Sequence, residues 1–508
     1  MSNSVLSIPA KDLPQFEELY AISDLHLGGT RGFQIFNAAA ELKSLVQHLR
    51  TSVNQKKKVG LVINGDFVDL LAENQPVYFD PVNAVDKLKR IAEDDAFAPV
   101  FEALKEFAAT KNRFLILNLG NHDLELALPW VRECLLKLLT GGNELARGRI
   151  TFAFDGTGYL CMVGKALVLC VHGNEVDNWN LTDHEKIRRI SRDVVQGRPV
   201  TDWIPNAGTQ LVIDVMNNLK RKFPFIDLLK PEVPAVIPTL IALAPDQLTK
   251  VQAIGATAAR LWWDGLRRST GFLGNQEEMV AEMAAAQRMM SSSFLPELEI
   301  TAPKMPPRND SSSYADALLQ ETERRLSQGE QPMSLIDQDR QGEYLGKWSA
   351  AWKYIWGEEP SEVLREALEK LREDESFDLS NEDDTFVNLD SQIGADIDFL
   401  IAGHTHLARA RRRKKGRGWY YNSGTWIRLI RLTKEVLESK EEFKKVFETF
   451  KNGKMEDLDA HKGLVMRRLT LVKIAADGTG TTGELQHASL DGEKVVLTAA
   501  PESRFTKI

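Results

Sequence analysis

The feature that most constrains the fold is an alternation of strand-like and helix-like segments over the first 175 residues. Short aliphatic runs are typical of buried strands, and apolar residues at helical spacing are typical of covering helices. The strand-like runs are ELYAIS (18–23), KVGLVIN (58–64), RFLILNL (113–119), RITFAF (149–154) and ALVLCVH (166–172). The helix-like segments are NAAAELKSLVQHLRTS (37–52) and FAPVFEALKEFAATK (97–111). This alternation predicts an α/β fold whose strand ends carry the chemistry.

The rest of the chain divides into an insertion and a return to strands. Helical patterns dominate from about 178 to about 390, and the acidic stretch REDESFDLSNEDD (372–384) at their end predicts a solvated loop. Strand composition then resumes in DIDFLIAG (396–403), GWYYNSGTW (418–426) and VMRRLTLVKI (465–474), with a charged surface helix expected at 434–450. We therefore expect a first core part at 16–177, a mainly helical lid or cap at 178–394, and a second core part with C-terminal strands at 395–508.

Composition excludes some classes of protein. The formal net charge of -8 gives no overall basic field for nonspecific nucleic-acid binding. Three cysteines without a C-x-x-C pair indicate a reducing compartment, so we expect a cytoplasmic protein. The N-terminal sequence has no secretory signal pattern, and no window approaches the ~18 uncharged apolar residues of a membrane span.

Five clusters of metal-competent residues follow strand-like runs, and they contain five of the nine histidines. They are Asp24-Leu25-His26, Gly65-Asp66-Phe67-Val68-Asp69, Gly120-Asn121-His122-Asp123, His172-Gly173-Asn174-Glu175 and Gly403-His404-Thr405-His406. Each cluster alone is also compatible with an ordinary turn. Their conjunction predicts a metal site at the strand ends.

The residue types in these clusters indicate the chemistry. Carboxylates, imidazoles and one amide oxygen suit divalent manganese, iron or zinc, and no thiolate favours a structural zinc site. The ligands are too many for one ion, whereas two cations about 3.5–4 Å apart need a shared ligand such as an aspartate. Such a pair can bind a phosphoryl oxygen and lower the pKa of a bridging water, which favours phosphoester hydrolysis.

Together the clusters resemble the calcineurin-like metallophosphoesterases, whose pattern is D-x-H, GDxxD, GNHD/E, H and GHxH in that order. The resemblance covers about residues 16 to 177 and 395 to 430. It implies a four-layer α/β/β/α sandwich with a large helical insertion. It also implies two divalent metal ions, with manganese first and iron or zinc as alternatives, and attack by a hydroxide that bridges them.

The resemblance assigns roles to residues at matching positions. Asp24, His26, Asp66 and His406 would bind one metal, and Asp66, Asn121, His172 and His404 would bind the other. His122 would contact the phosphate or protonate the leaving group, and Asp123 would orient its ring. Asn121 is also a candidate contact for the substrate phosphate.

Departures from the pattern narrow the subgroup. GDFVDLLA and GNHD differ from the GDxxDRG and GNHE of phosphoprotein phosphatases, which argues against a protein phosphatase. SDLHLGG, HGNEVD and YYNSGTW are more similar to the bacterial UDP-2,3-diacylglucosamine pyrophosphatase branch, in which a helical lid is inserted at the same place. That branch reads His-Gly-Asp where this chain has His172-Gly173-Asn174, and its lid is far smaller, so its lipid substrate does not transfer.

A basic run follows the last cluster and has two compatible interpretations. It comprises Arg409, Arg411, Arg412, Arg413, Lys414, Lys415 and Arg417. One interpretation is a β-hairpin at 407–423 with alternate basic side chains in water. The other is a phosphate-binding edge, with Arg409 or Arg411 turned inward, because arginine forks match phosphate oxygens.

The leading hypothesis is therefore a metal-dependent hydrolase of a phosphodiester or pyrophosphate bond. Its expected substrate is a phosphorylated small molecule, a nucleotide or a lipid-linked pyrophosphate. A nuclease is the alternative within enzymes, with the basic hairpin as its footprint. A non-catalytic scaffold, as the retromer subunit of this fold is thought to be, is the alternative outside enzymes, although every ligand position is intact here.

Overall fold

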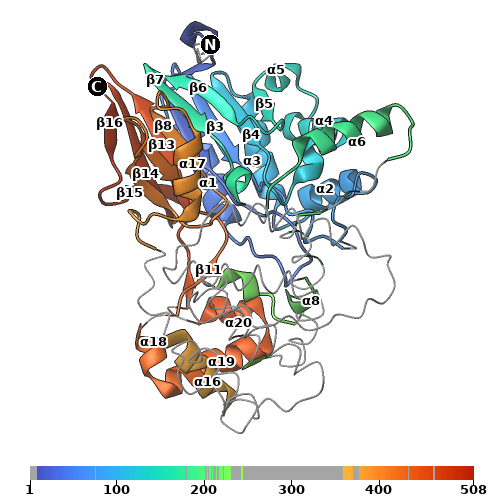
Figure 1. Cartoon of the computed structure of the whole chain (residues 1–508), viewed down its shortest axis with the longest axis vertical. Helices are drawn as coiled ribbons and strands as arrows, with labels where there is room; N and C mark the ends of the chain where they lie inside the picture. The colour runs from blue at the N-terminus through green and yellow to red at the C-terminus, as the bar shows by residue number, and fades with distance from the viewer. Residues whose placement is uncertain are drawn as a thin grey trace, which may run out of the picture. The chain divides into compact units, whose positions relative to one another are not determined.

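The computed structural model contains two large mixed β-sheets flanked by helices (Figure 1). It describes residues 8–74, 76–177, 180–200, 203, 205–206, 209, 213, 217–220, 222–229, 239, 242–243, 359–369, 377–432, 434–461 and 464–507. The chain divides into two compact units, Met1–Ala253 with Leu368–Ile508, and Ile254–Ala367. Most of the expected helical insertion lies outside the described residues.

The six-stranded sheet combines early and late parts of the chain. Its order is β1 (Gln15–Phe16), β6 (Tyr159–Val163), β7 (Ala166–Cys170), β8 (Phe399–Ala402), β10 (Trp419–Asn422) and β9 (Arg409–Arg412). Strands β7, β8 and β10 run parallel, and Val168 of β7 pairs with Phe399 of β8. Strands from the two core parts expected on either side of the insertion therefore lie side by side in this sheet.

The eight-stranded sheet has a parallel half and an antiparallel half. Its order is β15 (Lys494–Ala499), β14 (Thr481–Asp491), β13 (Thr470–Ala476), β2 (Glu18–Ile22), β3 (Val59–Asn64), β4 (Arg113–Asn118) and β5 (Ile150–Ala153), with β16 (Phe505–Lys507) paired to β14. Strands β2 to β5 are parallel, and β13 to β16 are antiparallel. A small separate sheet pairs β11 (Leu429–Ile430) with β12 (Val465–Met466).

The helices expected at 37–52 and 97–111 are present, and the one expected at 434–450 differs. The α-helices are α1 (Ala39–Thr51), α2 (Ala84–Glu93), α3 (Ala98–Ala109), α4 (Pro129–Thr140), α5 (Glu144–Arg147), α6 (His184–Val195), α8 (Asn217–Lys220), α16 (Pro360–Glu369), α17 (Asp384–Gln392), α18 (Lys434–Glu438), α19 (Lys440–Asn452) and α20 (Met455–Ala460). Short 3-10 helices are η1 (Ala10–Asp12), η2 (Leu124–Ala127), η3 (Asn174–Val176) and η5 (Ile226–Leu228). The single charged helix expected at 434–450 is two helices, because Ser439 caps α19 by accepting a hydrogen bond from the N–H of Glu442 (3.3 Å).

None of the helices that the structure describes combines the length and apolar character that crossing a membrane requires.

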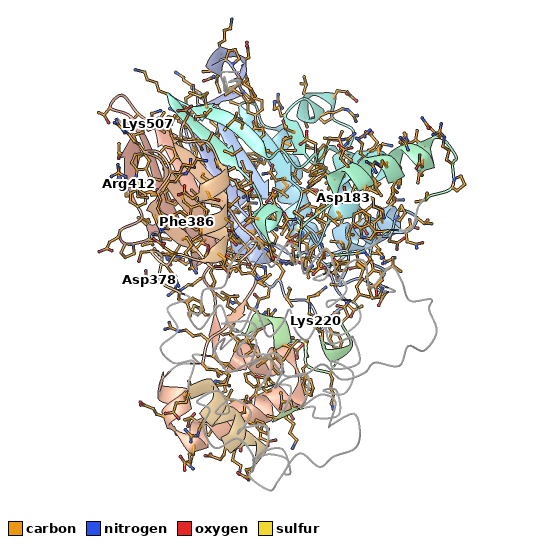
Figure 2. All side chains as sticks on the ribbon, in the orientation of Figure 1. Asp183, Lys220, Asp378, Phe386, Arg412 and Lys507 are labelled. Carbon is orange, nitrogen blue, oxygen red and sulfur yellow. The ribbon has the colours of Figure 1, made fainter. Side chains whose placement is uncertain are left out.

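One hydrophobic core joins the facing sides of the two sheets. Its buried members include Leu19, Ala21, Val62, Ile116, Cys161, Val168, Cys170, Ile401, Tyr421, Val472 and Ile474. Helices α1 and α3 contact the eight-stranded sheet (Figure 1). Helix α17 packs Phe386 and Leu389 against Leu400 and Tyr420 of the six-stranded sheet. Figure 2 labels Phe386 on this helix. Removing these apolar side chains from water stabilises the stacked sheets and holds their strand ends in place.

The basic run forms the expected hairpin, because β9 pairs antiparallel with β10. The prediction that alternate basic side chains lie in water is confirmed in part, because Arg412, Lys414, Lys415 and Arg417 are exposed, whereas Arg409 and Arg413 are buried. Arg409 Nε donates to Asp383 Oδ2 (2.9 Å), and Arg413 Nε donates to Asp390 Oδ1 (2.8 Å). The described part of the acidic stretch is a loop before α17 in which Asp378 and Glu382 are exposed, as predicted, while Asp383 also caps α17. Opposite charges far apart in the sequence pair here and reduce the cost of burying either one.

This pairing predicts a stability difference between two adjacent arginines. The side chain of Arg413 is 0% exposed, whereas Arg412 is exposed. Arg413→Ala leaves the Asp390 carboxylate buried without its partner, so we expect a loss of about 3–5 kcal/mol in the free energy of unfolding. Arg412→Ala should change it by less than about 0.5 kcal/mol. Urea unfolding of both variants measures this, and equal effects would contradict the buried pair.

Candidate metal centre

The candidate ligands lie in an uncommon backbone conformation. Seven non-glycine residues in the described part of the chain have a positive φ, and five of them are Asp24, His26, Asp66, His404 and His406. A side chain in the left-handed region costs about 1–3 kcal/mol, so such residues gather where function requires them. The strained positions coincide with three of the five sequence clusters.

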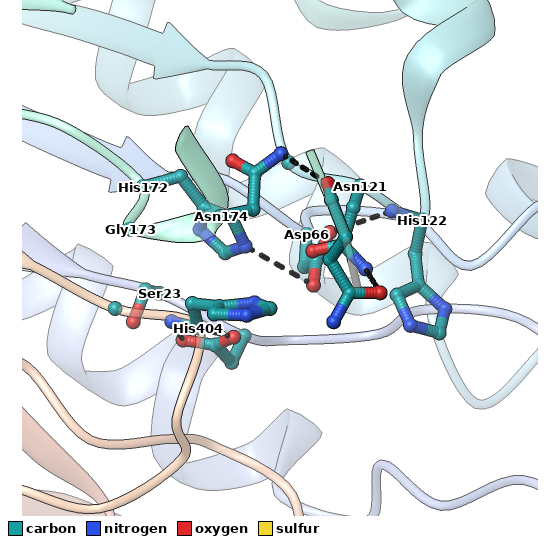
Figure 3. Close-up of polar contacts among 12 residues, drawn as sticks. Ser23, Asp66, Asn121, His122, His172, Gly173, Asn174 and His404 are labelled. Carbon is teal, nitrogen blue, oxygen red and sulfur yellow. Dashed lines mark hydrogen bonds and ion pairs between the residues drawn. The ribbon is translucent and has the colours of Figure 1, made fainter. Parts of the chain in front are cut away.

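Asp66, after β3, connects turns of both sheets. Its carboxylate is buried, and Oδ1 accepts a hydrogen bond from the backbone N–H of His122 (2.9 Å). Oδ2 lies 3.3 Å from His172 Nε2 (Figure 3). It also lies 3.6 Å from His26 Nε2. One oxygen thus fixes a neighbouring turn, while the other faces imidazoles that follow β7 of one sheet and β2 of the other.

Asp24, His26 and His406 form a group of three whose ligand atoms lie within 4.8 Å of one another. His26 Nε2 and His406 Nε2 face each other at 3.1 Å, and His406 Nε2 lies 3.5 Å from Asp24 Oδ1. The Asp24 carboxylate also accepts a hydrogen bond from the backbone N–H of His404 (3.0 Å to Oδ2). Two imidazole nitrogens and a carboxylate oxygen around one position are a donor set for a borderline divalent cation.

Part of the second expected set, Asp66 and His172, lies in one group. Asp24, Asp66 and His172 form another group with ligand atoms within 4.8 Å, and the ring of His404 lies 5.3 Å from that of His172. His172 Nδ1 lies 2.7 Å from the carbonyl oxygen of Asn64. Because a carbonyl only accepts, Nδ1 carries the proton and Nε2 offers its lone pair to the site.

Two glycines make this close approach possible. A Cβ on Gly120 would lie 2.0 Å from Asp66 Oδ1, and a Cβ on Gly65 would lie 2.2 Å from His172 Nδ1. Gly65 also has φ +89°. Any larger residue at either position would push these ligand turns apart.

Among the expected histidine and aspartate ligands, His404 is the one that the groups of three do not include. None of the groups found among the described residues contains it, and its Nε2 lies 2.8 Å from Asp177 Oδ2. A further group contains His26, Asp66 and His122. We expected His122 to contact the substrate and not to bind a metal, but its ring lies close enough to the other two residues to be a ligand.

Asp123, expected to orient the ring of His122, has a different role. Its carboxylate is buried and accepts hydrogen bonds from the backbone N–H groups of Gly120 (2.7 Å) and Phe67 (2.8 Å). The ring of His122 is held instead by Asp69, whose Oδ1 lies 3.2 Å from His122 Nδ1. The expectation was wrong because the buried N–H groups of two ligand turns need an acceptor, and Asp123 provides it.

Sequence reasoning missed three polar residues that contact candidate ligands. They are Asp69, Asp177 and Asn180. Asp69 also lies 3.5 Å from His26 Nδ1, and its place as the second aspartate of GDxxD was a signal that could have identified it. Asp177 and Asn180 follow HGNEV without any spacing that distinguishes them from loop residues.

Arg409 and Arg411, expected as possible phosphate contacts, bind the acidic segment. Arg409 is 1% exposed, and besides Asp383 it donates to the carbonyl oxygen of Asp378 (3.2 Å). Arg411 pairs with Glu382 and lies over the ring of Phe386 at 4.3 Å. These guanidinium groups hold the hairpin to the acidic segment, which favours the structural interpretation of the basic run.

Strong mutual electrostatics holds the site together. Burial alone would raise the pKa of the Asp66 carboxyl, but His172 and His122 hold that pKa well below its ordinary value. Burial opposes the charge on His172, yet Asp66 raises the pKa of His172 to about 10. Burial likewise opposes the charge on His122, and Asp69 and Asp66 raise its pKa to about 9. Imidazolium and carboxylate charges therefore balance one another in the protein alone.

Two buried atoms show that the residues fit bound cations. Asn121 Oδ1 and His172 Nε2 are buried and have no hydrogen-bond partner in the described structure. Buried polar atoms rarely stay without one. Divalent cations at this site would satisfy the amide oxygen of Asn121 and would bind His172 Nε2 once that nitrogen has lost its proton.

Two mixed sheets with overlapping groups of histidine and aspartate at their strand ends have the features of a metal-dependent phosphoesterase. Residues 18–226 match the family model of the calcineurin-like phosphoesterases. The chain therefore contains a calcineurin-like phosphoesterase domain with a candidate His/Asp metal site. The match identifies the family domain and does not support the UDP-2,3-diacylglucosamine pyrophosphatase branch within it. No curated protein and no solved structure matched the chain.

Metal binding should release protons from this site. The raised pKa of His172, about 10, keeps its imidazole protonated at neutral pH in the metal-free protein, whereas a ligand must be neutral. We expect about one proton released from His172 per protein at pH 7.5, and tighter binding as the pH rises toward 10. Titration calorimetry with Mn²⁺ in two buffers of different ionisation enthalpy measures the protons released. Identical heats in both buffers would contradict the prediction.

Proposed function

We propose that the protein is a dinuclear metal-dependent phosphohydrolase that cleaves a phosphodiester or pyrophosphate bond. The observation that carries this proposal is the overlap of the three His/Asp groups, in which Asp24, His26 and Asp66 each belong to two. Shared ligands are what two cations about 3.5–4 Å apart require. We propose Asp24, His26, Asp66 and His406 for one cation, and Asp66, Asn121, His172 and His404 for the other.

The chain's own residues would orient the substrate and handle the proton. Bound divalent cations, with manganese as our first choice, would supply the positive charge that phosphoryl oxygens and an attacking water require. Because Asp69 lies against His122 Nδ1, the Nε2 atom remains to bond a phosphate oxygen or to give a proton to the leaving oxygen. Burial of Asp24 and Asp66 strengthens every charge interaction at the site.

The alternatives have less support. A nuclease would use the basic run as a phosphate footprint, but Arg409, Arg411 and Arg413 pair with acidic residues and backbone carbonyls. A scaffold would not need overlapping His/Asp groups at strained backbone positions. We propose a phosphorylated small molecule, a nucleotide or a lipid-linked pyrophosphate as substrate, and the cytoplasm as the compartment, supported by three free cysteines.

The test is hydrolysis by the full chain loaded with manganese. Bis-p-nitrophenyl phosphate, p-nitrophenyl phosphate, nucleotide-sugar pyrophosphates and single-stranded DNA separate diester, monoester, pyrophosphate and nucleic-acid activity. We expect metal-dependent turnover on a diester or a pyrophosphate. Turnover confined to DNA would favour the nuclease, and bound metal without any turnover would favour the scaffold.

Asp66→Asn should remove metal and activity together. The variant replaces the carboxylate shared between both proposed ligand sets with a neutral amide. Without the metal charge, the variant should lose several kcal/mol of transition-state stabilisation. We therefore expect its kcat/KM to fall by about 10³-fold or more. Elemental analysis after dialysis counts the bound ions, and Asp155→Asn, an exposed aspartate in a turn, is the matched control. Full metal retention by Asp66→Asn would contradict the bridging role.

His122→Ala should keep the metal and lose rate. The imidazole is 17% exposed and lies beside Asp69, as expected for a group that faces substrate. General acid catalysis contributes about 10²–10⁴-fold, so kcat should fall by that factor with metal content unchanged. His48→Ala, on α1, is the control. If His122→Ala instead lost one ion, His122 would be a ligand, as its group with His26 and Asp66 allows.

A further inference from the structure

The loop after β7 contacts two candidate ligands that come from different sheets. Asp177 Oδ2 lies 2.8 Å from His404 Nε2, after β8, and accepts a hydrogen bond from Asn180 Nδ2 (2.7 Å). Asn180 Oδ1 in turn accepts a long hydrogen bond from Asn121 Nδ2 (3.5 Å), after β4. One loop thus connects His404 and Asn121 through two side chains.

The direction of each hydrogen bond follows from chemistry. An ionised carboxylate only accepts, so the Asn180 amide must turn its NH₂ group toward Asp177. Its oxygen is then left to accept from Asn121, which must donate through Nδ2. The Asn121 oxygen therefore faces the other way, and Oδ1 is the buried atom without a hydrogen-bond partner in the described structure.

The same carboxylate decides the tautomer of His404. Because Asp177 Oδ2 accepts, His404 Nε2 carries the proton in the neutral ring and Nδ1 offers its lone pair. A carboxylate on the distal nitrogen of a ligand imidazole also raises the basicity of the ligand atom and fixes the ring plane.

We propose that Asp177 and Asn180 are positioning residues that orient His404 and Asn121, and thereby set the affinity of the cation position to which both ligands belong. This inference rests on the proposed dinuclear site. The other position is built by contacts among Asp24, His26 and His406 themselves and should be affected less.

Asn174 gives this loop its shape and explains the departure from His-Gly-Asp. Its side chain is buried, and Nδ2 donates to the carbonyl oxygen of Asn180 (3.1 Å) and to Thr182 Oγ1 (3.0 Å). An ionised aspartate cannot donate either bond. At this position the asparagine therefore holds the backbone of Asn180 where its side chain reaches both Asp177 and Asn121.

The test is the number and affinity of bound Mn²⁺ ions in the full chain. We expect Asp177→Ala to weaken one of two ions about 10–100-fold, the usual effect of removing a partner of a ligand. Dialysis at limiting Mn²⁺ should then leave one ion, and the electron paramagnetic resonance signal should change from a coupled pair to a single ion. Asn180→Ala should act in the same direction, because it frees Asn121 and removes a donor to Asp177. Asp177→Asn, which keeps an acceptor oxygen, should recover part of the affinity.

Controls separate this inference from the proposed function. Glu185→Gln, an exposed change on α6, should bind both ions like the wild type, and thermal unfolding should show that Asp177→Ala and Asn180→Ala remain folded. If wild type binds two ions and both variants keep them with unchanged affinity, the positioning role is overturned while the proposed function stands. If wild type binds no ion, the proposed function fails and the inference fails with it.

Discussion

The buried carboxylate of Asp66 is the interaction on which the rest of the site depends. It lies where the turns after three strands meet, with one oxygen bound to the backbone of His122 and the other facing His172 and His26. A charge at this depth is tolerated only because imidazoles and a backbone N–H surround it. The carboxylate therefore determines how closely the two sheets bring their turns together.

The stacked sheets provide the rigidity that such a site needs. Apolar residues from both sheets form one core, so the strand ends cannot move apart without exposing them to water. That stability permits a strained backbone at Asp24, His26 and Asp66, and a close approach at Gly120 that admits no side chain. Packing away from the site thus offsets the conformational cost at the site.

The strands and helices of the core could be predicted because their signal is local. The runs at 18–23, 58–64, 113–119 and 166–172 became β2, β3, β4 and β7, since each is a short aliphatic segment that ends in a polar turn. Strand β6 (Tyr159–Val163) was not predicted, and the helix expected at 434–450 is interrupted at Ser439. The acidic segment and the basic hairpin were each judged alone, whereas Arg409 pairs with Asp383 across 26 positions of sequence and Arg411 pairs with Glu382 across 29.

The sequence by itself determined which residue types follow each strand, and hence that histidine, aspartate and asparagine would be available to divalent cations at one edge of an α/β fold. Only the tertiary structure decided what each side chain contacts. In the folded protein the ring of His122 contacts Asp69 rather than Asp123, and the ring of His404 contacts Asp177. The reason is physical: a hydrogen bond depends on a distance of about 3 Å through space and on which donors remain unsatisfied, and neighbouring positions in the sequence fix neither.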